Sequence, residues 1–115
     1  MPETIPNAGI YQIVNMVNRK RYLGRSRHLR RRWNVHRSLL RANARRNPHL
    51  QHAWNAYGER AFVFQVLEYC DPSLLVEREQ AHLDRADWTM LYNRSRDARN
   101  SGQPSGATRL KMSVS

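Results

Sequence analysis

Two short stretches of β-forming residues near the N-terminus, separated by a turn, constrain the fold of this chain most. Residues Gly9–Val14 alternate in character and are rich in β-forming side chains, which predicts a strand. The segment 15–18 contains two asparagines and is typical of a turn. A second strand is expected through Arg21–Leu23, and Gly24 is expected to end it. The sequence therefore predicts an N-terminal β-hairpin around which a small antiparallel sheet can form.

The hydrophobic pattern changes to a helical period after the hairpin. Ser26 is expected to cap a first helix, in which Leu29, Trp33 and Leu40 fall in one stripe because they are spaced by four and seven residues. A second helix is expected from Pro48 to a glycine stop at position 58.

A third strand and a third helix follow. Residues 61–69 are rich in Phe and Val and predict a strand that is largely buried. Asp71, followed by proline, predicts the start of a helix that runs to about Ala86. The order hairpin, helix, helix, strand, helix indicates an α+β fold, with a small three-stranded antiparallel sheet flanked by about three helices.

The composition changes after Asn93 to Arg, Ser, Asn, Gly, Pro and Gln with few apolar residues. This predicts a single folded domain over residues 1–93 and a flexible linker or tail over residues 94–115. The last nine residues, 107–115, faintly resemble the start of a short DNA-binding helix. The sequence leaves open whether the chain is a naturally minimal protein or a truncated one.

The net positive charge comes entirely from the first half of the chain. The net charge of +11 comes from 20 basic and 9 acidic residues; twelve basic residues and a single acid lie up to Gly58, and eight of each sign follow. A field this one-sided favours a polyanionic partner, nucleic acid ahead of an anionic membrane. A surface made basic only for solubility is the alternative, but it would normally carry interspersed acids.

Other broad features narrow the class of protein. No apolar run is long enough to span a membrane, and the N-terminus lacks the apolar core of a signal peptide. The single cysteine, Cys70, excludes an internal disulfide and fits a reducing compartment. We therefore expect a cytoplasmic protein of a bacterial or phage-infected cell, with no membrane partner.

Three polar residues fall at or beside stripes that should be apolar. In the third helix Glu79 lies between Leu75 and Leu83 on the inward face, where a carboxylate needs a compensating cation or metal. In the first helix Arg32 and His36 are one turn apart and border the inward stripe. A purely structural interpretation is open for each: Glu79 can pair with an arginine, and the other two can lie at the rim of the core.

Two triplets in the hairpin carry a resemblance to a known family. Gly9-Ile10-Tyr11 and, ten residues later, Tyr22-Leu23-Gly24 resemble the two-part signature of the GIY-YIG nucleases, with Leu where the second triplet usually has Ile. Further landmarks of the family follow in order: Arg32-Trp33, His36, Leu50-Gln51, Trp54-Asn55, Tyr57-Gly58, Glu77-Arg78-Glu79-Gln80 and Tyr92-Asn93. The resemblance covers residues 8–93, and the subtype it suggests is the catalytic domain of phage and intron-associated homing endonucleases.

The resemblance implies a metal-dependent DNA endonuclease. A single divalent ion, Mg²⁺ or Mn²⁺, would bind Glu79, the residue that helical geometry also selects over Glu77. Tyr11 would orient or deprotonate the attacking water, and Tyr22 would position the nucleophile or the phosphate. Arg32 would offset charge on the transition state.

The remaining implied roles concern support and binding. His36 would hydrogen-bond Tyr11 or a phosphate oxygen and is also a candidate base. Gly24 would allow a close backbone approach, and Asn93 would support the site. Arginines expected to contact DNA are Arg25, Arg27, Arg31, Arg41 and Arg45.

One position departs from the family pattern. Some homing members carry a functional histidine after the first helix, where this chain has Arg45. Either that role is absent or Arg45 replaces it by charge. The division of labour between His36 and Tyr11 is open for the same reason.

The alternatives concern function, assembly and targeting. The chain could instead be a non-catalytic basic nucleic-acid-binding module, or a nuclease of the same fold in restriction, repair or transposition. We expect a monomer or a transient dimer on DNA, and a separate or missing DNA-targeting domain.

Overall fold

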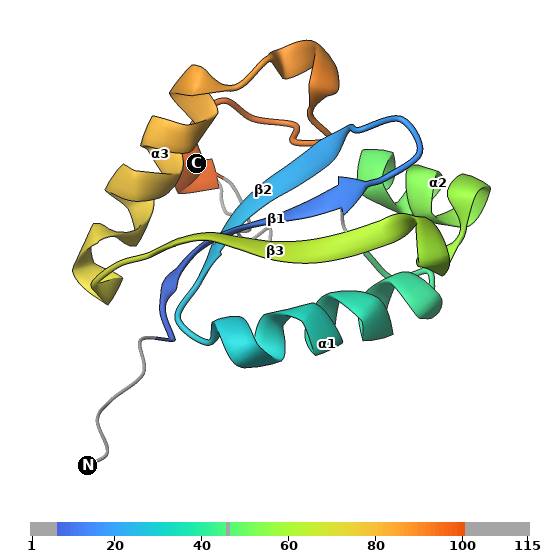
Figure 1. Cartoon of the computed structure of the whole chain (residues 1–115), viewed down its shortest axis with the longest axis horizontal. Coiled ribbons are helices and arrows are strands. Elements are labelled where there is room, and N and C mark those ends of the chain that lie inside the picture. Colours follow the sequence, from blue (N-terminus) through green and yellow to red (C-terminus); the bar gives the residue numbers. More distant parts are fainter. Residues whose placement is uncertain (1–6, 46, 101–115) are drawn as a thin grey trace, which may run out of the picture.

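The computed structural model describes residues 7–45 and 47–100 and has the predicted α+β architecture (Figure 1). The strands are β1 (Gly9–Asn15), β2 (Arg21–Ser26) and β3 (Phe62–Tyr69). The helices are α1 (Leu29–Arg41), α2 (Pro48–Tyr57) and α3 (Leu75–Arg85). Short 3₁₀ turns occupy Glu59–Ala61, Pro72–Leu74, Trp88–Met90 and Ala98–Asn100.

The sheet is antiparallel, with the order β2-β1-β3, so the hairpin and the later strand share β1 as their centre. The predicted hairpin is confirmed, but Gly24 does not end its second strand, because β2 continues to Ser26 opposite Gly9. The expectation that the third strand is largely buried is wrong. Most residues of β3 are only half-buried or are exposed. β2 is an edge strand too, but Leu91 and Asn93 cover its outer side, whereas no described strand or bridge lies beyond β3.

Gly9 is required by a close approach of two backbones. The register between β1 and β3 shifts between Ile10 and Tyr11, and this irregularity brings the carbonyl of Glu68 against Gly9. A Cβ at position 9 would lie 2.1 Å from that oxygen. The first residue of the first triplet is therefore a glycine for a structural reason.

The start of the first helix differs from the prediction. Ser26 is the last residue of β2, and its hydroxyl oxygen accepts a hydrogen bond from the backbone amide of His28. The helix begins at Leu29, and Asn7 accepts two of its first amides, from Leu29 and Arg30. Asn7, which is distant in the chain, therefore caps the helix in place of Ser26, which the sequence spacing predicted as the cap.

The start of α2 follows its sequence signal, whereas α3 begins later than its signal predicts. The Asn47 side chain accepts from the amides of His49 and Leu50, and proline stands at the first position of α2. Asp71 accepts from the amide of Ser73, as expected of a cap, but the cap closes a 3₁₀ turn and α3 begins at Leu75.

Alternation along the strands divides the core into two faces. Tyr11, Ile13 and Tyr22 pack against α1 and α2, whereas Ile10 and Leu23 pack toward α3. Figure 1 shows α1 and α3 on opposite sides of the sheet. Side chains two residues apart on β2 therefore reach the same layer, and neighbours reach opposite layers.

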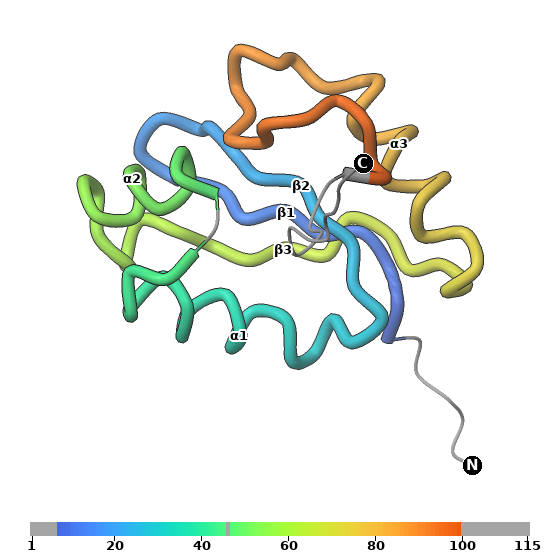
Figure 2. Tube along the Cα trace, turned by 180° about the vertical axis from the view of Figure 1, so that it is seen from behind, coloured from blue at the N-terminus to red at the C-terminus, as the bar shows by residue number. Residues whose placement is uncertain are grey.

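The chain after α3 returns to the sheet. Leu91 forms a parallel bridge with Arg21, and the 3₁₀ turn at Ala98–Asn100 lies beside α3 and β2 (Figure 2). Ala98 is fully buried against Leu23 and Leu83. Residues 94–100 of the expected linker therefore pack on the domain. The expected DNA-binding extension at 107–115 lies outside the described residues.

Within the described ranges, none of the helices combines the length and the apolar character needed to cross a membrane.

Candidate active site

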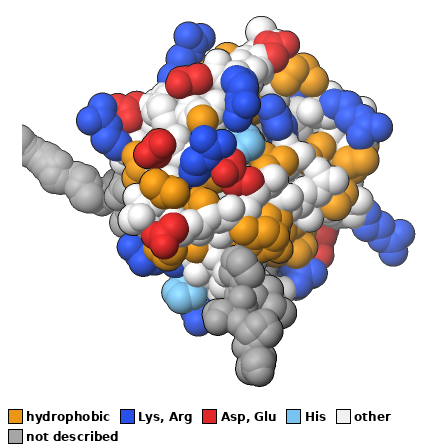
Figure 3. All heavy atoms as spheres, turned by 60° about the vertical axis from the view of Figure 1, so that its left-hand side comes forward, with side chains coloured by type: hydrophobic (Ala, Val, Ile, Leu, Met, Phe, Trp, Pro, Cys, Tyr) orange, Lys and Arg blue, Asp and Glu red, His pale blue; other side chains and the backbone are white. Residues whose placement is uncertain are grey.

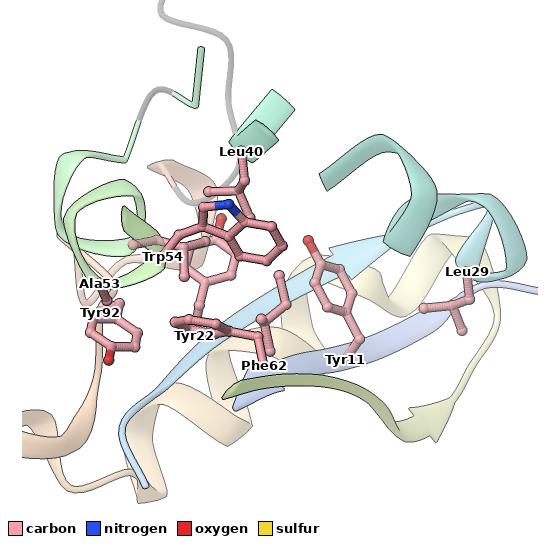
Figure 4. Packing of buried hydrophobic residues seen from close by; sticks show 10 residues of the cluster. Tyr11, Tyr22, Leu29, Leu40, Ala53, Trp54, Phe62 and Tyr92 are labelled. Atoms are coloured by element: carbon pink, nitrogen blue, oxygen red, sulfur yellow. The ribbon is translucent and has the colours of Figure 1, made fainter. Parts of the chain in front are cut away.

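A buried tyrosine–histidine pair lies between β1 and α1. Tyr11 projects from β1 toward α1 (Figure 4), and its hydroxyl oxygen is 2.6 Å from Nε2 of His36. Both side chains are almost completely buried. The ring of Tyr11 stacks on Phe64 of β3, with centroids 4.9 Å apart, so its direction is fixed. The expected hydrogen bond between His36 and Tyr11 is present in the structure.

Burial sets the protonation of this pair. Burial, together with the nearby charges of Arg45 and Arg32, lowers the pKa of His36 from 6.5 to about 2. The imidazole is therefore neutral. Burial also raises the pKa of Tyr11 well above its ordinary value of 10, with a further rise from Tyr22. A neutral Nε2 can accept the hydrogen bond that the Tyr11 hydroxyl donates.

Three charged side chains act on the Tyr11 hydroxyl from different elements. Arg32 on α1 and Arg45 after α1 lower the pKa of Tyr11, and Glu79 on α3 raises it, although burial outweighs them all. The fold thus gathers Arg32, Arg45 and Glu79 within electrostatic range of one hydroxyl group.

Gly24 lies directly under Tyr11. The two residues are cross-strand partners in the β1–β2 register. A Cβ at position 24 would lie 2.4 Å from the Tyr11 hydroxyl oxygen and 2.5 Å from Cζ. The close approach expected at Gly24 is therefore made by the tyrosine ring, which passes where any other side chain would begin.

Arg45, which was expected to contact DNA, lies over the ring of Tyr22. Its guanidinium carbon lies 5.7 Å from the ring centroid of Tyr22, and its backbone amide donates to the side chain of Gln51. Nε of Arg45 and Nε of Arg32 are both buried and have no hydrogen-bond partner within the described part of the chain. These two guanidinium groups offer donors to an anion.

Glu79 is fully buried on the inward face of α3, as helical geometry predicted, and Glu77 is exposed. Oε1 of Glu79 accepts a hydrogen bond from Nη1 of Arg25 at 2.8 Å. Arg25 was expected to contact DNA, but its side chain is only 16% exposed. The reason is strand alternation: Arg25 is two residues from Leu23 and therefore faces α3.

The donor set fits a hard divalent ion held by one carboxylate. Over residues 7–45 and 47–100 there is no group of three His, Cys, Asp or Glu that could enclose a metal. Glu79 supplies oxygen, and its position is one where the fold already places a positive charge, that of Arg25. Mg²⁺ suits such a site because it keeps several waters and takes few protein carboxylates.

Asn93 joins the end of the domain to β2. Its side-chain oxygen accepts from the amide of Leu23 at 2.8 Å, and its side-chain nitrogen donates to the carbonyl of Leu23 at 2.9 Å. Both Asn93 and Leu23 are buried. Asn93 thus makes with Leu23 the two backbone hydrogen bonds that a neighbouring strand would otherwise make.

The remaining arginines expected to bind DNA differ in availability. Arg27 and Arg31 are exposed. Arg41 makes two hydrogen bonds to Glu59, at 2.7 and 2.5 Å, and is therefore already paired at the surface.

Comparisons with known proteins agree with this fold and this arrangement of residues. The fold and the site define a small catalytic domain built on a three-stranded antiparallel sheet. The chain belongs to the GIY-YIG family, because the model of the GIY-YIG catalytic domain matches residues 7–93.

Two curated relatives are intron endonucleases. Probable intron-encoded endonuclease 1 of Neurospora crassa is 30% identical over 92 residues, which cover 74% of this chain and 29% of the relative. Intron-associated endonuclease 1 of Enterobacteria phage T4 is 34% identical over 74 residues, 63% of this chain and 30% of the relative. The chain spans less than a third of the length of either protein.

Two solved structures have the same fold. A point mutant of the catalytic domain of intron endonuclease I-TevI matches with a TM-score of 0.72 and 30% identity, covering 79% of this chain and 95% of that one. The catalytic domain of homing endonuclease I-TevI matches with a TM-score of 0.70 and 28% identity, covering 76% and 98%. The resemblance seen in the sequence is confirmed.

Proposed function

We propose that this chain is a divalent-metal-dependent DNA endonuclease of the homing type, which hydrolyses phosphodiester bonds. The observation that carries the proposal is the convergence at Tyr11: a hydroxyl 2.6 Å from a neutral, buried histidine, with the charges of Arg32, Arg45 and Glu79 acting on it. Relatives named as intron endonucleases support the homing subtype.

Tyr11 would move a proton in the first step. Water attacks phosphorus and gives its proton to the Tyr11 oxygen, while the Tyr11 proton passes to Nε2 of His36. The bond from phosphorus to the 3′ oxygen breaks, and the leaving oxygen takes a proton from solvent. His36 serves this transfer because a neutral ring has an acceptor nitrogen, whereas an imidazolium has none.

The substrate itself would make this transfer favourable. In the free protein a protonated His36 is costly, because the ring is buried beside two cations. A bound phosphate brings negative charge to Arg32 and Arg45, whose buried Nε groups have donors to offer. The phosphate would offset these cations and raise the pKa of His36. His36 would therefore be a stronger base with substrate bound than in the free protein.

A divalent ion, Mg²⁺ or Mn²⁺, would be held by Glu79. When bound, it would supply positive charge that clamps the scissile phosphate and stabilises the leaving oxygen. Tyr22, with Arg45 over its ring, would position the phosphate, and Asn93 would hold β2 in place behind it.

DNA would approach from the basic half of the chain. Arg27 and Arg31 are exposed near the start of α1. On the side that carries α3, acidic and basic side chains are interspersed (Figure 3), so that side is a weaker polyanion surface. A monomer has one such site, so a double-strand break would need two chains or two successive nicks. Site choice would come from a further targeting module.

A plasmid-nicking assay tests the proposal. Wild-type protein should nick supercoiled DNA with Mg²⁺ and not with EDTA. Glu79→Ala should lose nicking while still binding DNA, and Glu77→Ala, its exposed neighbour on α3, should keep it. A folded wild-type protein that binds DNA but never nicks it would instead be a nucleic-acid-binding module. Full activity in Glu79→Ala would overturn the metal assignment.

A further inference from the structure

One guanidinium nitrogen connects the carboxylate of the proposed metal site with the end of the domain. Nη1 of Arg25 donates to Oε1 of Glu79 at 2.8 Å and to the backbone carbonyl of Ala98 at 2.5 Å. Both distances belong to one nitrogen, so the ion pair and the position of Ala98 depend on each other.

The segment around Ala98 is held by the residue that follows Glu79. The side-chain oxygen of Gln80 accepts from the amide of Ala98, and the side-chain nitrogen of Gln80 donates to the carbonyl of Arg96, both at 2.8 Å. Ala98 is fully buried, and the ring of Trp88 lies under the guanidinium of Arg96. The segment 94–100 thus lies beside α3 (Figure 2), the helix that carries the buried carboxylate of Glu79.

The charge balance at this position requires a cation. A fully buried carboxylate is costly unless a positive charge compensates it, and Arg25 supplies that charge. A divalent ion on Glu79 would supply it as well. Arg25 occupies Oε1, so an ion that binds this oxygen would bring a second positive charge close to the guanidinium, and their repulsion would weaken the hydrogen bond from Arg25.

We propose that Arg25 is an internal competitor for the divalent ion at Glu79, and that docking of residues 94–100 holds it in that role through the carbonyl of Ala98. The segment after the catalytic domain then sets the affinity of the metal site. Binding of the ion moves Arg25 away from Glu79 and loosens the segment, by the reciprocity of coupled equilibria. The inference rests on the proposed function of Glu79 as the metal-binding residue.

Binding of Mn²⁺ to the full chain without DNA tests this, with free Mn²⁺ measured by electron paramagnetic resonance. Arg25→Met keeps the apolar stem and removes the charge. It should bind Mn²⁺ about tenfold more tightly than wild type, since a charge-assisted hydrogen bond no longer competes. Arg21→Met removes the same charge from the same strand, where Arg21 pairs with Gln12, and should change the affinity much less.

The coupling to the segment has its own test. Gln80→Ala removes the hydrogen bonds that hold Arg96 and Ala98 but leaves Arg25 and Glu79 unchanged. It should tighten Mn²⁺ binding several-fold in the wild-type background and have no effect in Arg25→Met, which is a coupling that independent sites do not show. If Arg25→Met does not fold, as judged by circular dichroism, Gln80→Ala alone decides.

The outcomes separate the two proposals. Unchanged or weaker Mn²⁺ binding in folded Arg25→Met means that Arg25 orients Glu79 and does not compete, which overturns the inference. An equal effect of Gln80→Ala in both backgrounds overturns the role of the segment. Undiminished Mn²⁺ binding in Glu79→Gln would instead remove the proposed metal site itself.

Discussion

Alanine at position 24 should separate the geometry of the Tyr11–His36 pair from the stability of the fold. Gly24 is a strand residue without a positive φ, so alanine adds only a methyl group and no backbone strain. That Cβ would lie 2.4 Å from the Tyr11 hydroxyl oxygen, against an ordinary contact of 3.4 Å or more. The hydroxyl must therefore retreat by about 1 Å.

This displacement of the hydroxyl affects both the stability of the fold and the rate of nicking. Tyr11 is buried and stacked on Phe64, so the ring can move only by disturbing its neighbours. Overpacking of this kind costs about 1–3 kcal/mol of unfolding free energy. A misplacement of about 1 Å at a reacting group lowers a rate by about 10²-fold. Gly24→Ala should therefore fold, with reduced stability, and nick DNA about a hundredfold more slowly.

Single-turnover nicking of supercoiled plasmid and urea unfolding measure the two effects separately. Ala53→Val is a matched control, because Ala53 is a buried residue of the same core on α2, outside the site. It should lose stability to a similar degree and retain the rate. A folded Gly24→Ala protein with the wild-type rate would refute the reasoning, since the hydroxyl position would then not limit catalysis.

Three further predictions concern pH, the end of the domain and DNA binding. Because the pKa of His36 falls from 6.5 in the unfolded chain to about 2 in the fold, the unfolded state takes up a proton first as the pH drops. Below the unfolded pKa this group should therefore lower the free energy of unfolding by up to about 1.4 kcal/mol per pH unit. Urea unfolding from about pH 6 to 5 should show this dependence of stability on pH. The same pH dependence in His36→Gln would contradict the prediction. Asn93→Ala leaves the buried amide and carbonyl of Leu23 without their partner and should cost about 1–3 kcal/mol in urea unfolding; a loss below that range would mean that water replaces the side chain. DNA-binding titrations at several salt concentrations give the slope of the logarithm of the binding constant against the logarithm of the salt concentration. Arg31→Ala should reduce this slope by about 1, whereas Arg41→Ala should change it less, because that side chain is already paired with an acid. Equal effects of the two variants would count against this distinction.

Much of the fold followed from local patterns. The hairpin and the three helices depend on periodicity and end signals within a few residues of each element, such as the proline at the start of α2. The inward direction of Glu79 also followed, because it depends only on the helical angle from Leu75 and Leu83. Contacts between neighbours in the chain are fixed by backbone geometry and need no knowledge of the rest.

The errors arose where a residue depends on a partner distant in the chain. The cap of α1 comes from Asn7, not from Ser26. β3 is exposed because no described segment pairs with its outer edge, as Leu91 does with the outer edge of β2. Strand order is decided by which surfaces pack together, and no property of residues 61–69 alone contains it.

The candidate site likewise combines features that the sequence predicted with features that depend on distant elements. By itself the sequence singled out the candidate site residues, since Tyr11, His36 and Glu79 stand out by motif or by a polar residue in an apolar stripe. Only the tertiary structure decided their partners. Arg25 faces Glu79 and Arg45 lies over Tyr22. The physical reason is that a long arginine side chain is buried where an opposite charge or an aromatic face compensates its desolvation, and those partners come together only after distant elements have packed.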